Sequence, residues 1–210
     1  MSKPKAKARR SADRTREHVL DVARDLFYWN GIRATGVDRV AADAGIAPTA
    51  LYRLFPSKDA LVAAYVERTE QRYREWFEAV TVEDGRSAAE RIDALFEALG
   101  EQTRPDVCRG CPFMMALTEF PNKEVQGHHD AVRLKKWVRA RIRKLASEHA
   151  GELPRQAIDS AALADHLTLL FEGVYATVQA LGHDGPAKRA RELAATLTRN
   201  RAPTEPRHAK

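Results

Sequence analysis

The chain has 210 residues, of which 44% are hydrophobic and 30% are charged, with 11 glycines and 10 prolines. This composition is typical of a globular protein and excludes collagen-like, low-complexity and wholly disordered classes. The length is sufficient for one large domain, or for a small and a medium domain, with a buried core. Two cysteines cannot form a disulfide framework, so we expect a reducing, cytoplasmic compartment.

Positive charge is concentrated in the first quarter of the chain. Residues 1–58 carry 12 Lys and Arg against 6 Asp and Glu, whereas residues 59–210 carry 23 of each sign. This asymmetry indicates a nucleic-acid-binding module joined to a neutral domain. Alternatively, the cations within residues 1–12 form a flexible, solvated tail that only aids solubility. No apolar signal segment follows the basic N-terminus, and polar residues interrupt the longest apolar segment, 157–181, so we expect neither export nor a membrane span.

Apolar residues recur at helical spacing in three consecutive segments near the N-terminus. The first helix is predicted to end near Gly31, and the second ends at Gly45, which can adopt the left-handed conformation that reverses a chain. The third begins at Pro48 and ends before Pro56. The apolar positions are Val19, Val22, Ala23, Leu26 and Phe27, then Val37, Val40, Ala41 and Ala44, then Leu51, Leu54 and Phe55. This layout predicts a helix-turn-helix over residues 36–55, whose second helix enters the major groove of DNA.

The residues of this region also form a recognisable pattern. It is carried by the segments Gly31-Ile32-Arg33-Ala34-Thr35, Val37-Asp38-Arg39-Val40-Ala41, Ala44-Gly45-Ile46-Ala47 and Leu51-Tyr52-Arg53-Leu54-Phe55-Pro56-Ser57-Lys58-Asp59-Ala60-Leu61. Over residues 14–65 the chain closely resembles the TetR family of bacterial transcriptional regulators. The resemblance implies an all-helical homodimer with an N-terminal DNA-binding domain and a C-terminal domain that binds a small molecule. Two positions depart from the family pattern, because Gly36 and Ala47 stand where many members have a hydroxyl residue.

DNA contacts are expected in and beside the second helix of the motif. The resemblance implies phosphate contacts for Tyr52 and Lys58, and Lys58 also lies in the first turn of a helix, where unpaired N–H groups attract anions. Thr35 is a third phosphate candidate. If the recognition helix begins near Pro48, the residues that face the groove are Pro48, Thr49, Ala50 and Arg53. Arg53 can then hold guanine bidentately, and Thr49 or Ala50 can contact a thymine methyl group.

The rest of the chain continues in helical periods, with segments at 92–99, 134–145, 156–181 and 187–199, and no strand pattern. The segment from 156 to 181 is apolar nearly all round, so it must be covered on most sides. By resemblance, the last two helices pair with their copies in a four-helix dimer interface. Dimerisation would let two helix-turn-helix units read the two halves of a palindrome.

Candidate ligand residues are apolar or aromatic side chains of this domain with three polar anchors. They are Phe113, Met114, Glu119, Phe120, Trp137, His166, Phe171, Glu172 and Tyr175. The alternative is that most of them are ordinary core residues. Cys108-x-x-Cys111, with His128 and His129, leaves open a zinc site, a redox pair or two unlinked thiols. Seven cations between Arg133 and Lys144 indicate either a solvated helix face or a site for an acidic partner.

The sequence therefore predicts an all-α protein with a DNA-binding domain at 13–73, a helical regulatory and dimerisation domain at 74–199, and flexible tails at 1–12 and 200–210. We expect a cytoplasmic homodimeric repressor that a small molecule releases from a palindromic DNA operator. One alternative is an architectural protein that binds DNA with little sequence preference. The other is an enzyme, but no nucleophile triad, phosphate loop or convincing metal set is present, so we expect no catalytic residue, metal or cofactor.

Overall fold

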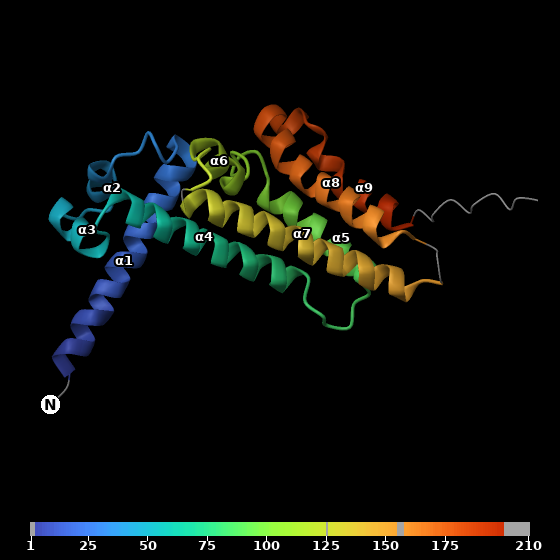
Figure 1. Cartoon of the computed structure of the whole chain (residues 1–210), viewed down its shortest axis with the longest axis horizontal. Helices are drawn as coiled ribbons and strands as arrows, with labels where there is room; N and C mark the ends of the chain where they lie inside the picture. Colours follow the sequence, from blue (N-terminus) through green and yellow to red (C-terminus); the bar gives the residue numbers. More distant parts are fainter. Residues whose placement is uncertain (1–2, 125, 155–157, 200–210) are drawn as a thin grey trace, which may run out of the picture. The chain divides into compact units, whose positions relative to one another are not determined.

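The computed structural model describes residues 3–124, 126–154 and 158–199, with side chains from residue 12 onward. The described residues form α-helices and two short 3₁₀ helices, which confirms the all-α prediction (Figure 1). The helices are α1 (Lys3–Asn30), α2 (Val37–Asp43), α3 (Pro48–Leu54), α4 (Lys58–Val80), α5 (Ala88–Gln102), α6 (Pro112–Glu119), α7 (Gln126–Glu152), α8 (Ser160–Leu181), η1 (Gly182–Asp184), η2 (Pro186–Arg189) and α9 (Ala190–Arg199). The predicted tail at 200–210, and residues 156 and 157 of the predicted dimer helix, lie outside the described residues.

The chain divides into two compact units. The helix-turn-helix unit comprises Met1–Tyr73 and Pro112–Arg133, and the C-terminal unit comprises Arg74–Cys111 and Leu134–Lys210. The predicted boundary after residue 73 therefore coincides with one division of the structure. The structure differs from the prediction in placing 112–133 with the N-terminal segment. Contacts made by Glu119 and Arg133, described below, explain this placement.

The helix-turn-helix unit is built around one hydrophobic core. Most apolar positions of the sequence pattern are buried in it, whereas Val22, Val37 and Leu54 are partly buried against it. Its buried residues include Val19, Leu20, Ala23 and Phe27 of α1, Val40 and Ala41 of α2, Leu51 of α3, Phe55 after it, and Leu61, Val62 and Tyr65 of α4. The rings of Phe27 and Tyr65 meet edge to face with centroids 5.3 Å apart. Gly45 has φ +65° in the turn between α2 and α3, which confirms the left-handed conformation expected there.

The C-terminal unit has well-defined helix starts and an aromatic core. Ser87 and Glu90 form a reciprocal capping box at the start of α5. The Asp159 carboxylate accepts hydrogen bonds from two backbone amides at the start of α8. Phe171 of α8 is fully buried and packs edge to face against Phe96 of α5, with ring centroids 6.3 Å apart. The caps fix where α5 and α8 begin, and the aromatic contact packs the two helices together.

The N-terminal segment differs from the predicted flexible tail over residues 1–12. Helix α1 extends back to Lys3, and Pro4 lies in its first turn, where a missing N–H costs nothing. The lysines, alanines and arginines that follow are favourable helix formers, which is why the helix continues. None of the helices in the described part of the chain combines the length and apolar character needed to cross a bilayer.

Candidate nucleic-acid interface

The residues predicted to face the major groove lie on the exposed side of α3. The exposed positions are Pro48, Thr49, Tyr52 and Arg53. Leu51 points the other way and is fully buried, and Ala50 is partly buried between the two sides. Residues four apart lie on the same side of a helix, so the exposed positions form one surface. Among the described residues, the side chains of Tyr52 and Arg53 have no hydrogen-bond or ion-pair partner.

Contacts from α1 hold the motif from behind. The His18 ring nitrogen Nε2 is 3.1 Å from the carbonyl oxygen of Ala44, which ends α2. The Arg16 guanidinium lies over the Phe55 ring, 5.0 Å from its centroid. Since Phe55 ends α3, one helix braces both members of the motif, and the exposed side of α3 has a fixed support.

The two departures from the family pattern fall at the starts of α2 and α3. Gly36 and Ala47 are the N-caps of these helices, and neither provides a side-chain hydrogen bond to the first turn. The amide groups at both helix starts therefore lack the protein cap that a Ser or Thr would give. Gly36 and Ala47 are exposed, so these helix starts face solvent.

Lys58 lies where the sequence placed it, in the first turn of α4. The Ser57 hydroxyl caps this helix by accepting a hydrogen bond from the Ala60 amide. The Lys58 ammonium donates to the Arg33 carbonyl oxygen at 3.2 Å. An ammonium has three donors, so Lys58 can hold this turn and still contact an anion. Arg33 lies in the turn between α1 and α2 and is exposed. It was not among the predicted site residues.

Thr35 does not support the predicted phosphate contact. Its side chain is buried, and its hydroxyl donates to the Gly31 carbonyl oxygen at 2.8 Å. A buried hydroxyl that is already paired cannot reach a phosphate. Thr35 instead stabilises the turn between α1 and α2.

The most specific contact of this turn comes from a side chain that is distant in sequence. The two carboxylate oxygens of Glu119, in α6, accept hydrogen bonds from the backbone amides of Ile32 at 3.0 Å and Arg33 at 2.7 Å. Glu119 was predicted to anchor a ligand, but these contacts occupy its carboxylate. Glu119 follows Ile32 by 87 positions and Arg33 by 86, so no local sequence pattern could have indicated these hydrogen bonds.

The other α6 candidates have three different environments. Phe113 is buried and meets Tyr73 edge to face with ring centroids 5.7 Å apart. Phe120 packs against the core of the helix-turn-helix unit, so both residues stabilise that unit. Met114 is exposed.

The aromatic candidates of the C-terminal unit come together in its core. The Phe77 ring has centroid distances of 5.4 Å to Trp137 and 6.2 Å to Phe171. Phe171 also contacts Tyr175, and both are buried. Trp137 keeps partial exposure, and the Arg74 guanidinium lies 4.5 Å from its ring centroid. The alternative of ordinary core residues therefore holds for Phe171 and Tyr175.

Glu172 is held by a charged partner inside the C-terminal unit. Its carboxylate accepts from the Lys135 ammonium at 2.6 Å. Burial alone would lower the pKa of Lys135, but the nearby Cys111 and Glu172 outweigh it and raise that pKa above its ordinary value. Cys108 and Cys111 are buried, unlinked thiols. Among the described residues, no group of three or more His, Cys, Asp or Glu side chains could hold a metal ion.

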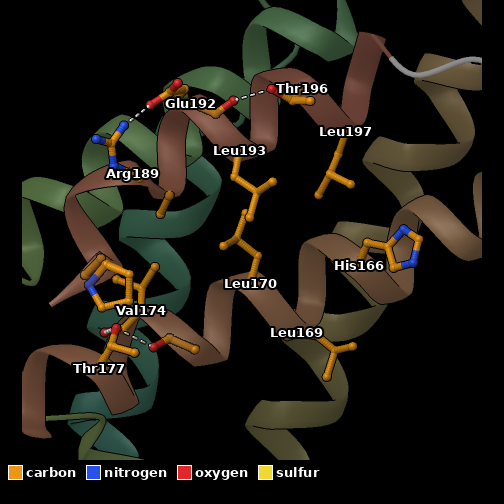
Figure 2. Close-up of a pocket in the computed structure, with 14 residues that line it drawn as sticks. His166, Leu169, Leu170, Val174, Thr177, Arg189, Glu192, Leu193, Thr196 and Leu197 are labelled. Carbon is orange, nitrogen blue, oxygen red and sulfur yellow. Dashed lines mark hydrogen bonds and ion pairs between the residues drawn. The ribbon is translucent and has the colours of Figure 1, made fainter.

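An apolar groove runs along α8 and α9, with a volume of about 750 Å³. Leu170 of α8 and Leu193 of α9 point toward one another across it, and His166 lies at the same surface (Figure 2). Leu169 beside it is 72% exposed and Leu193 is 47% exposed. Exposed leucines at a groove of this size are typical of a surface that binds another protein or a ligand.

Most of the cations between Arg133 and Lys144 are paired. Arg133 contacts Glu70 and Asp130, and the other pairs are Lys135 with Glu172, Arg139 with Asp165, Arg141 with Glu78, and Lys144 with Glu83 and Glu148. Pairing with acids neutralises most of the positive run. This supports the interpretation of a solvated helix face over that of a site for an acidic partner.

Comparison with protein families places both regions of the chain. The family model described as "Bacterial regulatory proteins, tetR family" matches residues 19–65, which contain α2 and α3. The model described as "Tetracyclin repressor-like, C-terminal domain" matches residues 88–194, more than half of the chain.

Similar proteins include regulators and solved structures. The HTH-type transcriptional regulator EthR of Mycolicibacterium smegmatis is 26% identical over 91% of this chain and 86% of its own length. YjdC of Escherichia coli is 27% identical over 51% of this chain, so the match spans 56% of YjdC. The crystal structure of a TetR transcriptional regulator from Chloroflexus aurantiacus has a TM-score of 0.76 at 25% identity, covering 91% of this chain and 98% of that one. Together with the matched family models and the exposed recognition helix, these likenesses show that the chain belongs to the TetR family of DNA-binding transcriptional regulators.

Proposed function

We propose that the protein is a cytoplasmic, homodimeric repressor that binds a palindromic operator and releases it when a small molecule binds. The observation that carries this proposal is the exposed, unpaired polar side of α3, supported from behind by a buried core. A recognition helix needs side chains that are free to reach base edges on a scaffold that fixes their direction.

The roles of the α3 residues follow from their chemistry. Arg53 carries a planar donor pair that matches the two acceptors of guanine in the major groove. Thr49 and Ala50 offer methyl groups to thymine, and Pro48 is at the exposed start of the helix. Tyr52 and Lys58 supply phosphate contacts that set the position of the helix on the duplex. Base contacts then give specificity, and phosphate contacts give most of the affinity.

The groove along α8 and α9 supports the homodimer. Exposed leucines on two adjacent helices are stabilised when a second copy of the same face covers them. A two-fold dimer presents two recognition helices to successive turns of one duplex face. An effector that favours one spacing of these helices over another would shift the equilibrium between bound and free operator.

The first experiment is selection of duplexes from a random pool by the wild-type protein and by Tyr52→Ala at near-physiological salt. We expect the wild type to enrich one palindrome, and Tyr52→Ala to bind it more weakly. Tight binding of the pool without enrichment of any motif would replace this proposal with the architectural alternative.

The dimer is tested by sedimentation of Leu169→Glu beside Val82→Glu. Both side chains are largely exposed, so neither substitution disturbs the core of a protomer. Leu169→Glu places a charge at the α8–α9 groove and is expected to give monomers, whereas Val82→Glu stays dimeric. A dimer in both variants would show that this groove is not the interface.

A further inference from the structure

We infer that Glu119 is a positioning residue for operator binding: its carboxylate holds the turn at residues 31–33 in the form that the helix-turn-helix unit needs on DNA. The inference rests on the proposed function. It concerns a residue that touches no DNA, and acts through the turn that leads into α2.

The turn is held from two sides. Glu119 accepts from the backbone amides of Ile32 and Arg33, and Lys58 donates to the carbonyl oxygen of Arg33. The Ile32 side chain is buried, whereas Arg33 is exposed. In solution water would compete for the exposed Arg33 amide, so its pairing depends on the charged carboxylate, which accepts more strongly than a neutral oxygen.

Gly31 gives the turn its shape. Its φ is +93°, a conformation that side-chain-bearing residues rarely adopt. A Cβ placed on Gly31 would lie 3.5 Å from the nearer Glu119 oxygen, which is ordinary contact. The requirement for glycine is therefore one of backbone angle. This angle presents two successive amides to one carboxylate.

The held turn includes the elements that would meet phosphate. Arg33 lies within it, and Lys58 is attached to it through the Arg33 carbonyl. The Thr35 hydroxyl ties the following residues back to Gly31. Loss of the Glu119 contact would therefore remove a restraint on Arg33, on Lys58 and on the start of α2 at the same time.

The test compares Glu119→Gln with Glu124→Gln, an exposed carboxylate after α6 whose loss changes the charge equally. A glutamine at 119 keeps the side-chain length and one acceptor oxygen, but its NH2 group faces the second of the two backbone amides, where an acceptor is required. Amide hydrogen exchange of at least one of Ile32 and Arg33 should accelerate, and the operator Kd should rise, each about tenfold in Glu119→Gln. The ratio of specific to pool binding should fall as well. Glu124→Gln should match the wild type, and both variants should melt within a few degrees of it.

Two results would overturn the inference. One is wild-type exchange at both Ile32 and Arg33 in a folded Glu119→Gln protein, and the other is accelerated exchange with an unchanged operator Kd. If Glu119→Gln does not fold, slow exchange of the Arg33 amide in the free wild-type protein supports the contact, and fast exchange refutes it. If the wild type selects no palindrome, the proposed function fails instead. The exchange experiment still decides whether the Glu119 carboxylate holds the turn at residues 31–33.

Discussion

Helices α3 and α7 both carry basic side chains, and their surroundings are opposite. On α3, Arg53 is exposed and has no charged partner among the described residues. On α7, the carboxylate of Asp165 lies 2.8 Å from Arg139, and that of Glu83 lies 2.6 Å from Lys144. More cations lie on α7 than on α3, but most of those on α7 are paired, with Lys136 and Arg143 as the exceptions among the described residues.

From this difference we expect pairing, more than the number of charges, to identify a surface for DNA. A cation already paired with a carboxylate adds little net field and releases few counterions from DNA. An unpaired guanidinium on a rigid helix loses little when it binds a base edge or a phosphate. The following predictions test whether the two helices differ in this way, starting with the largest effect.

The largest effect is expected for Arg53→Ala, with Arg139→Ala as the control. Losing a bidentate contact to guanine should reduce discrimination at one base pair of each half-site by roughly 5- to 150-fold. Arg139→Ala removes a paired arginine from α7 and should leave the selected motif unchanged. Duplex selection followed by competition binding measures both. Equal loss of selectivity in the two variants would remove the distinction between the helices.

A smaller effect is expected for Lys58→Ala, measured beside Lys136→Ala. Lys58→Ala should weaken binding to all sequences and lower the slope of log K against log salt by about one unit, because one phosphate contact is lost. Lys136 is an exposed lysine of α7, so its variant tests whether location matters as well as charge. An unchanged slope in Lys58→Ala would refute its phosphate contact.

The smallest effect concerns the pair of Lys144, on α7, with Glu83, in the segment between α4 and α5. The hydrogen bond from Lys144 holds the pKa of Glu83 below its ordinary value. A lowered carboxylate pKa stabilises the fold above the unfolded-state pKa, and this contribution is lost as the pH falls through the folded-state value. In Lys144→Ala, the Glu83 carboxyl should titrate at a higher pH by carbon NMR. An unshifted titration would mean that the pair does not form in solution.

The helix-turn-helix was predictable because its signals are local. Gly45, Pro48 and Pro56 mark the turn and the ends of α3 within a dozen residues, and the apolar positions repeat at helical spacing. The hydrophobic core of the unit then uses those same positions. Thr35 was predicted to contact phosphate because sequence spacing does not reveal that its hydroxyl points inward and bonds to the Gly31 carbonyl oxygen.

The regulatory region was less predictable because its meaning depends on distant partners. Phe171 and Tyr175 have the aromatic character of ligand-binding residues, but their rings complete a core. The Glu119 and Glu172 carboxylates have the character of polar anchors, but each is committed to a partner far away in sequence. Only the fold brings these partners together.

The split composition of the helix-turn-helix unit has a consequence for how the protein is made. Residues 1–73 emerge from the ribosome well before 112–133, which contribute Glu119 and Phe120 to the same unit. A nascent chain therefore contains its recognition helix for some time before Glu119 is available to bind the turn at residues 31–33. A fragment that ends at Tyr73 would remain in this unfinished condition, so a minimal DNA-binding fragment should also include residues 112–133.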